Sequence, residues 1–301
     1  MDRIDAMRLF LAVVDQGGFT AAARRENTSP AQVSKRVAAL EDQLGARLLQ
    51  RTTRTVSLTE AGAAYAERAR ELLQSFDALE DAVRAEQGEA VGLLKVTAPA
   101  TFGRLHLVEP VIAFMARHPG LEVRLDVSDR MVDLVEEGVD VAVRIGDLPD
   151  SSLIARKLAP VRLCVAAAPD FVARQGGVET IDALERSPCI LDYNLPNPRR
   201  WSFRSSDGQD VDARVEGRLR VNSGEAAGEA AAAGLGVAMG PTFILAPYLK
   251  DGRLVQVMTR YQPAQRAVWA LFPQSRYLAR RVRLFVDFLA EQFSGEPSWE
   301  P

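Results

Sequence analysis

The side chains of this chain that are best suited to bind another molecule are basic, and they cluster near the N-terminus. Residues 18–55 hold seven arginines and lysines against three acids, a local net charge of +4 in a chain whose formal net charge is −3. Arginine and lysine neutralise phosphate groups, so a basic cluster in an acidic chain is typical of a nucleic-acid contact. A solvated basic surface without special function would carry the same charge, so the spacing of the residues has to distinguish the two.

The spacing from Ser29 to Gly45 predicts a helix with one narrow polar face. Ser29 is a suitable N-cap, Pro30 suits the first helical position, and Gly45 suits the end. The apolar residues that recur at helical spacing are Val33, Val37, Leu40 and Leu44. The opposite face carries Ala31, Ser34, Lys35 and Ala38. So slim a face fits the major groove of DNA, and the acids Glu41 and Asp42 restrict phosphate contact to the first half of the helix.

Two flanking segments complete a DNA-binding unit. A short alanine-rich helix from Thr20 to Arg25, with Thr20 as its cap, has the small side chains that let two helices of a helix-turn-helix cross closely. After Gly45, a basic threonine-rich run predicts a two-stranded ribbon that grips the DNA backbone or minor groove. The residues that we expect to contact DNA are Thr20, Ser29, Pro30, Ala31, Gln32, Ser34, Lys35, Arg36, Arg51, Thr52, Thr53 and Arg54.

A heptad pattern follows, with Thr59 as a plausible N-cap. Its positions are Leu58, Gly62, Tyr65, Ala69, Leu72, Phe76, Leu79 and Val83. Pairing of two chains is the simplest way to bury so long and narrow a seam. Packing within one chain is the alternative, and the poor coiled-coil residues early in the seam favour it there. We expect dimerisation through Tyr65, Leu72, Phe76, Leu79 and Val83.

Beyond a glycine-bounded hinge at Gly88 to Gly92, strands and helices alternate, which predicts a parallel, doubly wound α/β sheet. Ligands of such sheets bind outside the carboxyl ends of the strands. The helix that begins at Phe102 would favour an anion at its N-terminus, and Arg144 would bind a carboxylate. An ion pair of Arg144 with Asp126 or Asp147 is the structural alternative.

The expected ligand is a small organic acid. The loop at Ala98 to Ala100 has few hydroxyl groups, which argues against a ligand with many polar contacts. Trp201 either closes over the ligand or fills a core. The candidate binding residues are Pro99, Ala100, Thr101, Phe102, Ser128, Arg144, Ile145, Gly146, Trp201, Asn222, Gly240 and Pro241.

The sequence gives little indication of a catalytic or metal-binding site. His106 and His118 are the only histidines, and Cys164 and Cys189 lack the spacing of metal ligands. We expect the two cysteines to be buried thiols rather than a redox switch. We also expect no cofactor. No apolar run reaches the ~18 residues of a membrane span. The first residues lack the pattern of a signal peptide, so a cytoplasmic protein is expected.

Several runs of this sequence resemble one bacterial family. The run FTAAARRENTSPAQVSKRVAALEDQLGARLLQRTTRTVSLTEAG is similar to the winged helix-turn-helix of LysR-type transcriptional regulators. The segments LLKVTAPATFGRLHLVEPVIAFMARHPGLEVRL, VDLVEEGVDVAVRIGDLPDSSLIARKL and AAAGLGVAMGP resemble their effector domain. The resemblance covers essentially the whole chain.

The resemblance implies a regulator rather than an enzyme. It would bind a double-stranded DNA operator under the control of a small molecule, as a homodimer that pairs into a tetramer. The implied parts are a winged helix-turn-helix at 1–58, a linker helix at 59–87, a hinge at 88–92 and a periplasmic-binding-protein-like effector domain at 93–301. That domain would comprise two α/β subdomains, about 93–165 with 266–293, and about 166–265. A transport-type solute-binding protein would share this second half, but not the basic N-terminal unit.

Overall fold

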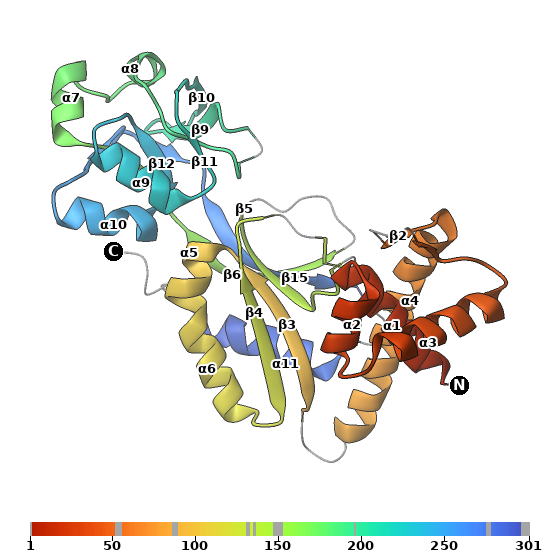
Figure 1. The fold of residues 1–301 in the computed structure, drawn as a ribbon. Coiled ribbons are helices and arrows are strands. Elements are labelled where there is room, and N and C mark those ends of the chain that lie inside the picture. Colours follow the sequence, from red (N-terminus) through yellow and green to blue (C-terminus); the bar gives the residue numbers. More distant parts are fainter. Residues whose placement is uncertain are drawn as a thin grey trace. The chain divides into compact units, whose positions relative to one another are not determined.

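The computed structural model describes residues 2–51, 56–85, 90–130, 133–134, 137–146, 153–195, 197–274 and 278–295, without the side chains of residues 51, 74, 77, 78 and 80–85. The chain forms two compact units (Figure 1). The first comprises residues 1–92, 132–140 and 273–283, and the second comprises residues 93–131, 141–272 and 284–301.

The first unit begins with a helix-turn-helix and a hairpin. Its elements are α1 (Arg3–Gln16), α2 (Phe19–Arg25), α3 (Pro30–Leu44), β1 (Leu49–Arg51), β2 (Val56–Leu58) and α4 (Glu60–Ala85). The strands β1 and β2 pair antiparallel, with Leu49 opposite Leu58. One apolar core joins the helices, and its fully buried members include Phe10, Val13, Ala22, Val33, Val37 and Leu40. The predicted helix-turn-helix and basic hairpin are therefore present.

The predicted ends of α3 are confirmed, whereas the start of α2 differs. The Ser29 hydroxyl accepts a hydrogen bond from the Gln32 N–H, and Gly45 ends α3 in the left-handed conformation with φ of 65°. Helix α2 begins at Phe19, with Gly18 in the cap position. Thr20 is therefore the second residue of the helix and not its cap. The helix begins one residue earlier than predicted because Phe19, its first residue, packs against the core of this unit.

The start of α4 is fastened to the hairpin. The Thr59 hydroxyl accepts from the Gly62 N–H at 2.9 Å and donates to the Arg47 carbonyl at 2.7 Å, which confirms Thr59 as the cap. A Cβ atom at Gly62 would lie 1.9 Å from the Leu48 carbonyl oxygen, so only glycine allows this approach. The first turns of α4 thus belong to the same unit as the helix-turn-helix.

The second unit contains two lobes. Lobe I is a five-stranded sheet in the order β4-β3-β5-β15-β6 together with helical elements. Its strands are β3 (Gly92–Ala98), β4 (Leu121–Val127), β5 (Val141–Gly146), β6 (Leu153–Val161) and β15 (Arg266–Pro273), and its helices are α5 (Ala100–Phe102), a π-helical turn (Gly103–Leu107), α6 (Val108–Arg117) and α11 (Arg280–Gln292). Strand β3 runs parallel to β5, but β15 runs antiparallel to it, so the sheet is mixed rather than parallel as predicted. The reason is that β15 returns from the other lobe.

Lobe II extends from β7 to β14. Its elements are β7 (Leu163–Ala167), α7 (Pro169–Gln175), α8 (Ile181–Arg186), β8 (Leu191–Asp192), β9 (Arg200–Ser205), β10 (Asp210–Arg214), β11 (Arg220–Val221), α9 (Gly224–Ala232), β12 (Ala238–Pro241), α10 (Thr242–Lys250), β13 (Val255–Val257) and β14 (Tyr261–Pro263). They form the sheets β12-β7-β13, β10-β9-β14 and β11-β8. The chain enters this lobe between Val161 and Leu163 and leaves it between Pro263 and Arg266. The hairpin of β9 and β10 was not predicted.

Candidate functional site

The residues predicted to contact DNA lie on α2, on α3 with its cap, and in the hairpin. Thr20, Ser29, Pro30, Ala31, Gln32, Lys35 and Arg36 are exposed, and Ser34 is half-buried. On the opposite face Val33 and Val37 are fully buried. Lys35 forms no ion pair or hydrogen bond with any described residue, so its ammonium group is available to a partner. The Arg36 guanidinium, by contrast, lies 3.4 Å from the Asp5 carboxylate.

A buried carboxylate that sequence reasoning missed connects α3 to the hairpin. Glu41 is only 2% exposed, and its Oε1 accepts hydrogen bonds from the N–H groups of Leu48 at 2.8 Å and Leu49 at 3.1 Å. Its Oε2 lies 3.5 Å from the Arg47 guanidinium. Glu41 therefore fixes where β1 begins. Of the hairpin residues predicted to contact DNA, Thr52, Thr53 and Arg54 lie outside the described residues, as does the side chain of Arg51.

One face of helix α4 packs against the core of its own chain, and the other face is exposed. Tyr65 packs edge-on against Phe10 at 5.6 Å between ring centroids, and Leu73 is buried in the same core. Tyr65 is thus half-buried against the core of its own chain, and its part in dimerisation stays a prediction. Leu72 and Leu79 are 49% and 62% exposed. Phe76 is half-buried, and the side chain of Val83 lies outside the described residues.

A pocket of about 1010 Å³ lies between lobe I and lobe II, and we call it the cleft pocket. Its lobe I residues are Ala100, Thr101, Arg104, Val108, Leu125, Val127, Ser128, Asp129 and Arg130. Its lobe II residues are Tyr193, Asn194, Asn222, Ser223 and Glu225. Most of these residues lie at or just after the carboxyl ends of β3, β4, β8 and β11, in agreement with the rule that ligands bind outside the carboxyl ends of strands.

Only part of the predicted ligand-binding set lines this pocket. Ala100, Thr101, Ser128 and Asn222 do. Pro99 precedes α5, and Phe102 is buried against Phe243 and Phe293. Gly240 and Pro241 pair with β7, and Ile145 and Gly146 pair with β15. These four residues therefore belong to the sheets and do not line the pocket.

Arg144 and Trp201 do not line the cleft pocket either. The Arg144 guanidinium donates to the Val143 carbonyl at 2.8 Å and to the Thr97 hydroxyl at 3.4 Å. Trp201 is 1% exposed in the core of lobe II beside Phe203, so it fills a core and does not close over a ligand. The alternation of β9 explains this, since residues 201 and 203 point inward while 200, 202 and 204 point outward.

The predicted anion position at the start of α5 is already occupied. The Asp129 carboxylate accepts a hydrogen bond from the Ala100 N–H at 3.0 Å. Charge in the pocket is mixed: an ion pair joins Arg104 of lobe I to Glu225 at the start of α9 in lobe II. Nearby, burial raises the pKa of the Asp192 carboxyl, the Asn194 N–H lowers it, and the Asp129 charge raises it again.

Sequence reasoning missed the charged residues of the pocket, although their positions carried a signal. Asp129 and Arg130 directly follow Ser128, and Glu225 follows Asn222 by three residues. Arg104 lies three residues after Thr101, so a helix places both on one side.

The cysteines are placed as buried thiols. Cys189 is 2% exposed, and burial raises the pKa of its thiol to about 12. Cys164 is 5% exposed. In the described part of the chain, no three His, Cys, Asp or Glu residues come together as metal ligands. No helix described there has the length and apolar character needed to cross a membrane.

Two family models match the chain. The model described as "Bacterial regulatory helix-turn-helix protein, lysR family" matches residues 4–63. The model described as "LysR substrate binding domain" matches residues 87–294. Helices α2 and α3 thus fall within the first matched region, and the helices and strands of both lobes fall within the second.

Individual relatives match along nearly the full length. The chain is 36% identical over 299 residues to an HTH-type transcriptional repressor of Pseudomonas aeruginosa (strain UCBPP-PA14), covering 99% of this chain and 94% of that protein. It is 36% identical over 293 residues to HTH-type transcriptional regulator DmlR of Escherichia coli (strain K12), covering 97% and 94%.

Solved structures agree. The full-length structure of AphB, a virulence activator of Vibrio cholerae, has a TM-score of 0.62 at 29% identity, covering 96% of this chain and 99% of that one. The structure of CrgA, a LysR-type transcriptional regulator from Neisseria meningitidis, has a TM-score of 0.59 at 28% identity, covering 97% and 99%.

Proposed function

This chain belongs to the LysR family of DNA-binding transcriptional regulators, and from that premise we propose how its described surfaces bind an operator and an effector. The observation that carries the DNA contact is the narrow, exposed face of α3 with the available ammonium group of Lys35. We assign base contact to this face, with Ala31, Gln32 and Ser34 beside the lysine. Thr20, Ser29, Pro30, Arg36 and the hairpin residues Arg51, Thr52, Thr53 and Arg54 would contact the backbone.

Operator binding by the Lys35→Ala variant tests this assignment. A lost base contact costs about 1–3 kcal/mol, so specific affinity should fall about 5- to 150-fold while non-specific affinity falls far less. Fluorescence anisotropy with operator and scrambled DNA at one salt concentration measures both. Lys250→Ala, at an exposed lysine in lobe II, is the matched control. Equal losses on both DNAs would assign Lys35 to phosphate instead.

The effector that we propose is a small organic acid that also carries a hydrogen-bond donor. Arg104 and the N-terminus of α9, where Ser223 is the cap, form the part of the cleft pocket that favours a negative group. Asp129 on the lobe I side accepts hydrogen bonds. The exposed surfaces of Val108 and Val127, 40% and 46%, suit an apolar body between these groups. Arg104 thus takes the role that the sequence suggested for Arg144.

A ligand carboxylate would compete with Glu225 for the Arg104 guanidinium. Because that ion pair joins the two lobes, the exchange alters their connection, and the ligand can favour one lobe arrangement over another. The chain between the lobes and α4 passes through residues 88–92, of which 88 and 89 lie outside the described residues. Coupling of about 1–3 kcal/mol is typical of such regulation.

A thermal-shift screen of carboxylates against the full chain tests the effector assignment. Acids that raise the melting temperature should lose their effect in Arg104→Gln, because the carboxylate loses its charged partner. The control is Arg156→Gln, which breaks a similar exposed ion pair, with Asp287, outside the pocket. Stabilisation by acids that persists in Arg104→Gln would refute this site.

We also propose that the regulator acts in the cytoplasm as a homodimer that pairs into a tetramer. The exposed leucines of α4 support the first contact. A second apolar face supports a further contact, since Leu105, Ile112 and Met115 are 44%, 62% and 39% exposed at helical spacing. Light scattering of the full chain distinguishes two chains from four.

A further inference from the structure

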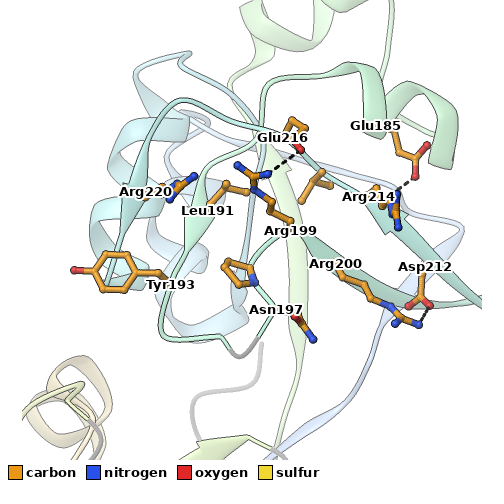
Figure 2. Close-up of a pocket in the computed structure, with 12 residues that line it drawn as sticks. Glu185, Leu191, Tyr193, Asn197, Arg199, Arg200, Asp212, Arg214, Glu216 and Arg220 are labelled. Atoms are coloured by element: carbon orange, nitrogen blue, oxygen red, sulfur yellow. Dashed lines mark hydrogen bonds and ion pairs between the residues drawn. The ribbon is translucent and has the colours of Figure 1, made fainter.

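A second hollow lies entirely within lobe II, on the outer side of its β9–β10 hairpin. It has a volume of about 1090 Å³, and we call it the arginine groove because Arg199, Arg200, Arg214 and Arg220 line it. Figure 2 shows Arg220 and Arg214 on opposite sides of the groove, with Arg199 between them. The size is that of a pocket for a small molecule.

The strand register places two arginines directly opposite each other. On the outer face of the hairpin, Arg204 faces Asp210 and Ser202 faces Asp212, and both pairs are complementary. The third pair on that face is Arg200 opposite Arg214. Like charges directly opposite each other on paired strands are destabilising. In this row, the residue opposite Arg214 is therefore a second arginine and not an acid.

The acids of the groove are already engaged. Asp212 pairs with Arg200, and this ion pair together with the Ser202 hydroxyl holds the pKa of Asp212 below its usual range. Glu216 lies 3.4 Å from the Arg199 guanidinium. Glu185 accepts from the backbone N–H of Arg214 at 2.7 Å (Figure 2). Among the described residues, no acid pairs with the guanidinium of Arg214 or Arg220, and both side chains are exposed.

We propose that the arginine groove binds a small polyanion with at least two negatively charged groups, which Arg214 and Arg220 hold from opposite sides. Guanidinium groups bind carboxylates and phosphates through paired hydrogen bonds, so both chemistries fit. This site is separate from the cleft pocket. Among the residues that the structure describes, only Tyr193 lines both, and it is 56% exposed.

Calorimetric titration of the full chain with citrate and with pyrophosphate, at constant ionic strength, tests this site. We expect binding of at least one of them, and the stronger of the two identifies carboxylate or phosphate as the preferred chemistry. Acetate, with one charge, should bind at least about tenfold more weakly. Each of Arg214→Gln and Arg220→Gln should weaken polyanion binding about tenfold or more, because a charge-assisted hydrogen bond is lost.

Arg204→Gln is the matched control, since this exposed arginine lies on β9 beyond the groove and pairs with Asp210. It should leave polyanion affinity unchanged. The proposal is overturned if neither probe binds at millimolar concentration, or if Arg204→Gln weakens binding as much as the groove variants do. Arg104→Gln should also leave polyanion binding intact, so a failure of the effector assignment and a failure of this site are distinguishable. Circular dichroism of each variant verifies that it is folded.

Discussion

At the scale of single residues, the buried charge of Glu41 decides how the hairpin is attached to α3. A buried carboxylate is costly unless hydrogen bonds satisfy it, and here two backbone N–H groups and an arginine do so. The same two N–H groups would be left without this acceptor if the side chain were removed. Glu41 thus links the stability of the helix-turn-helix to the position of the hairpin.

We expect Glu41→Ala to lower the stability of the N-terminal unit by about 2 kcal/mol or more, because it leaves the buried N–H groups of Leu48 and Leu49 without their acceptor. Operator affinity should fall with it, because the hairpin loses its fixed start. Glu41→Gln keeps an oxygen acceptor and should lose much less. Chemical unfolding and DNA anisotropy measure the two effects. An alanine variant with unchanged stability would show that water replaces the carboxylate at no cost.

Burial of Asp192 predicts an unusual dependence on pH. Its pKa is raised, so the folded state prefers the neutral carboxyl. The stability that this group contributes is present below its ordinary pKa and is lost as the pH rises through the raised value. Asp192→Asn should therefore raise the melting temperature at neutral pH by about 2–4 °C, and the gain should vanish as the pH falls towards about 4. Asp212→Asn should have the opposite sign, because the pKa of Asp212 is lowered. A lower melting temperature of Asp192→Asn at neutral pH would contradict this account.

Cys189 should be unreactive in the folded protein. Its thiol is 2% exposed and has a pKa of about 12, so almost no thiolate forms at about pH 8. Iodoacetamide should label it only after unfolding in guanidinium, as mass spectrometry of the peptide would show. Labelling of the native protein within minutes would indicate that lobe II opens readily.

At the scale of elements, α4 packs within its own chain along its first part and exposes apolar side chains further along. Its early residues, including Tyr65 and Ala69, pack in the DNA-binding core, whereas Leu72 and Leu79 face outward. An exposed apolar ridge beside a buried one is typical of a helix that has a second partner. The seam is therefore divided between intramolecular and outward contacts, as the poor coiled-coil residues in its first part indicated.

The variant with Leu72→Asp and Leu79→Asp should be monomeric with a folded effector domain, and its operator affinity should fall at least tenfold through lost avidity. Light scattering and DNA anisotropy measure this. Replacing the exposed Glu67 and Glu71 with alanine is the matched control on the same helix. An assembly of unchanged mass in the leucine variant would mean that other surfaces hold the chains together.

At the scale of the whole molecule, effector and operator must influence each other reciprocally. A carboxylate that stabilises the protein should change operator affinity by a factor of about 5–150, and operator DNA should change the affinity for that acid by the same factor. Titrations in both orders measure the two factors. Arg104→Gln should abolish the coupling while operator binding persists. Unequal factors would indicate an additional linked event, such as assembly.

The sequence alone determined the helix-turn-helix, the caps of α3 and α4, and the class of protein. Ser29, Pro30, Gly45 and Thr59 act through hydrogen bonds and backbone conformation within a few residues, so local spacing was enough to predict them. The β9–β10 hairpin also had a local signal, Asp207-Gly208 between alternating residues, with Gly208 at φ of 84°, but it was overlooked.

Tertiary structure alone decided which side chains share a surface. Arg104 and Glu225 are 121 residues apart, and only the approach of two lobes pairs them. Arg144 and Gly240 lie at predicted strand ends, yet hydrogen bonds and sheet pairing keep them from the cleft pocket, and core packing does the same for Trp201. The reason is physical: a strand pattern fixes the alternation of side chains, whereas the face that becomes core depends on what packs against it.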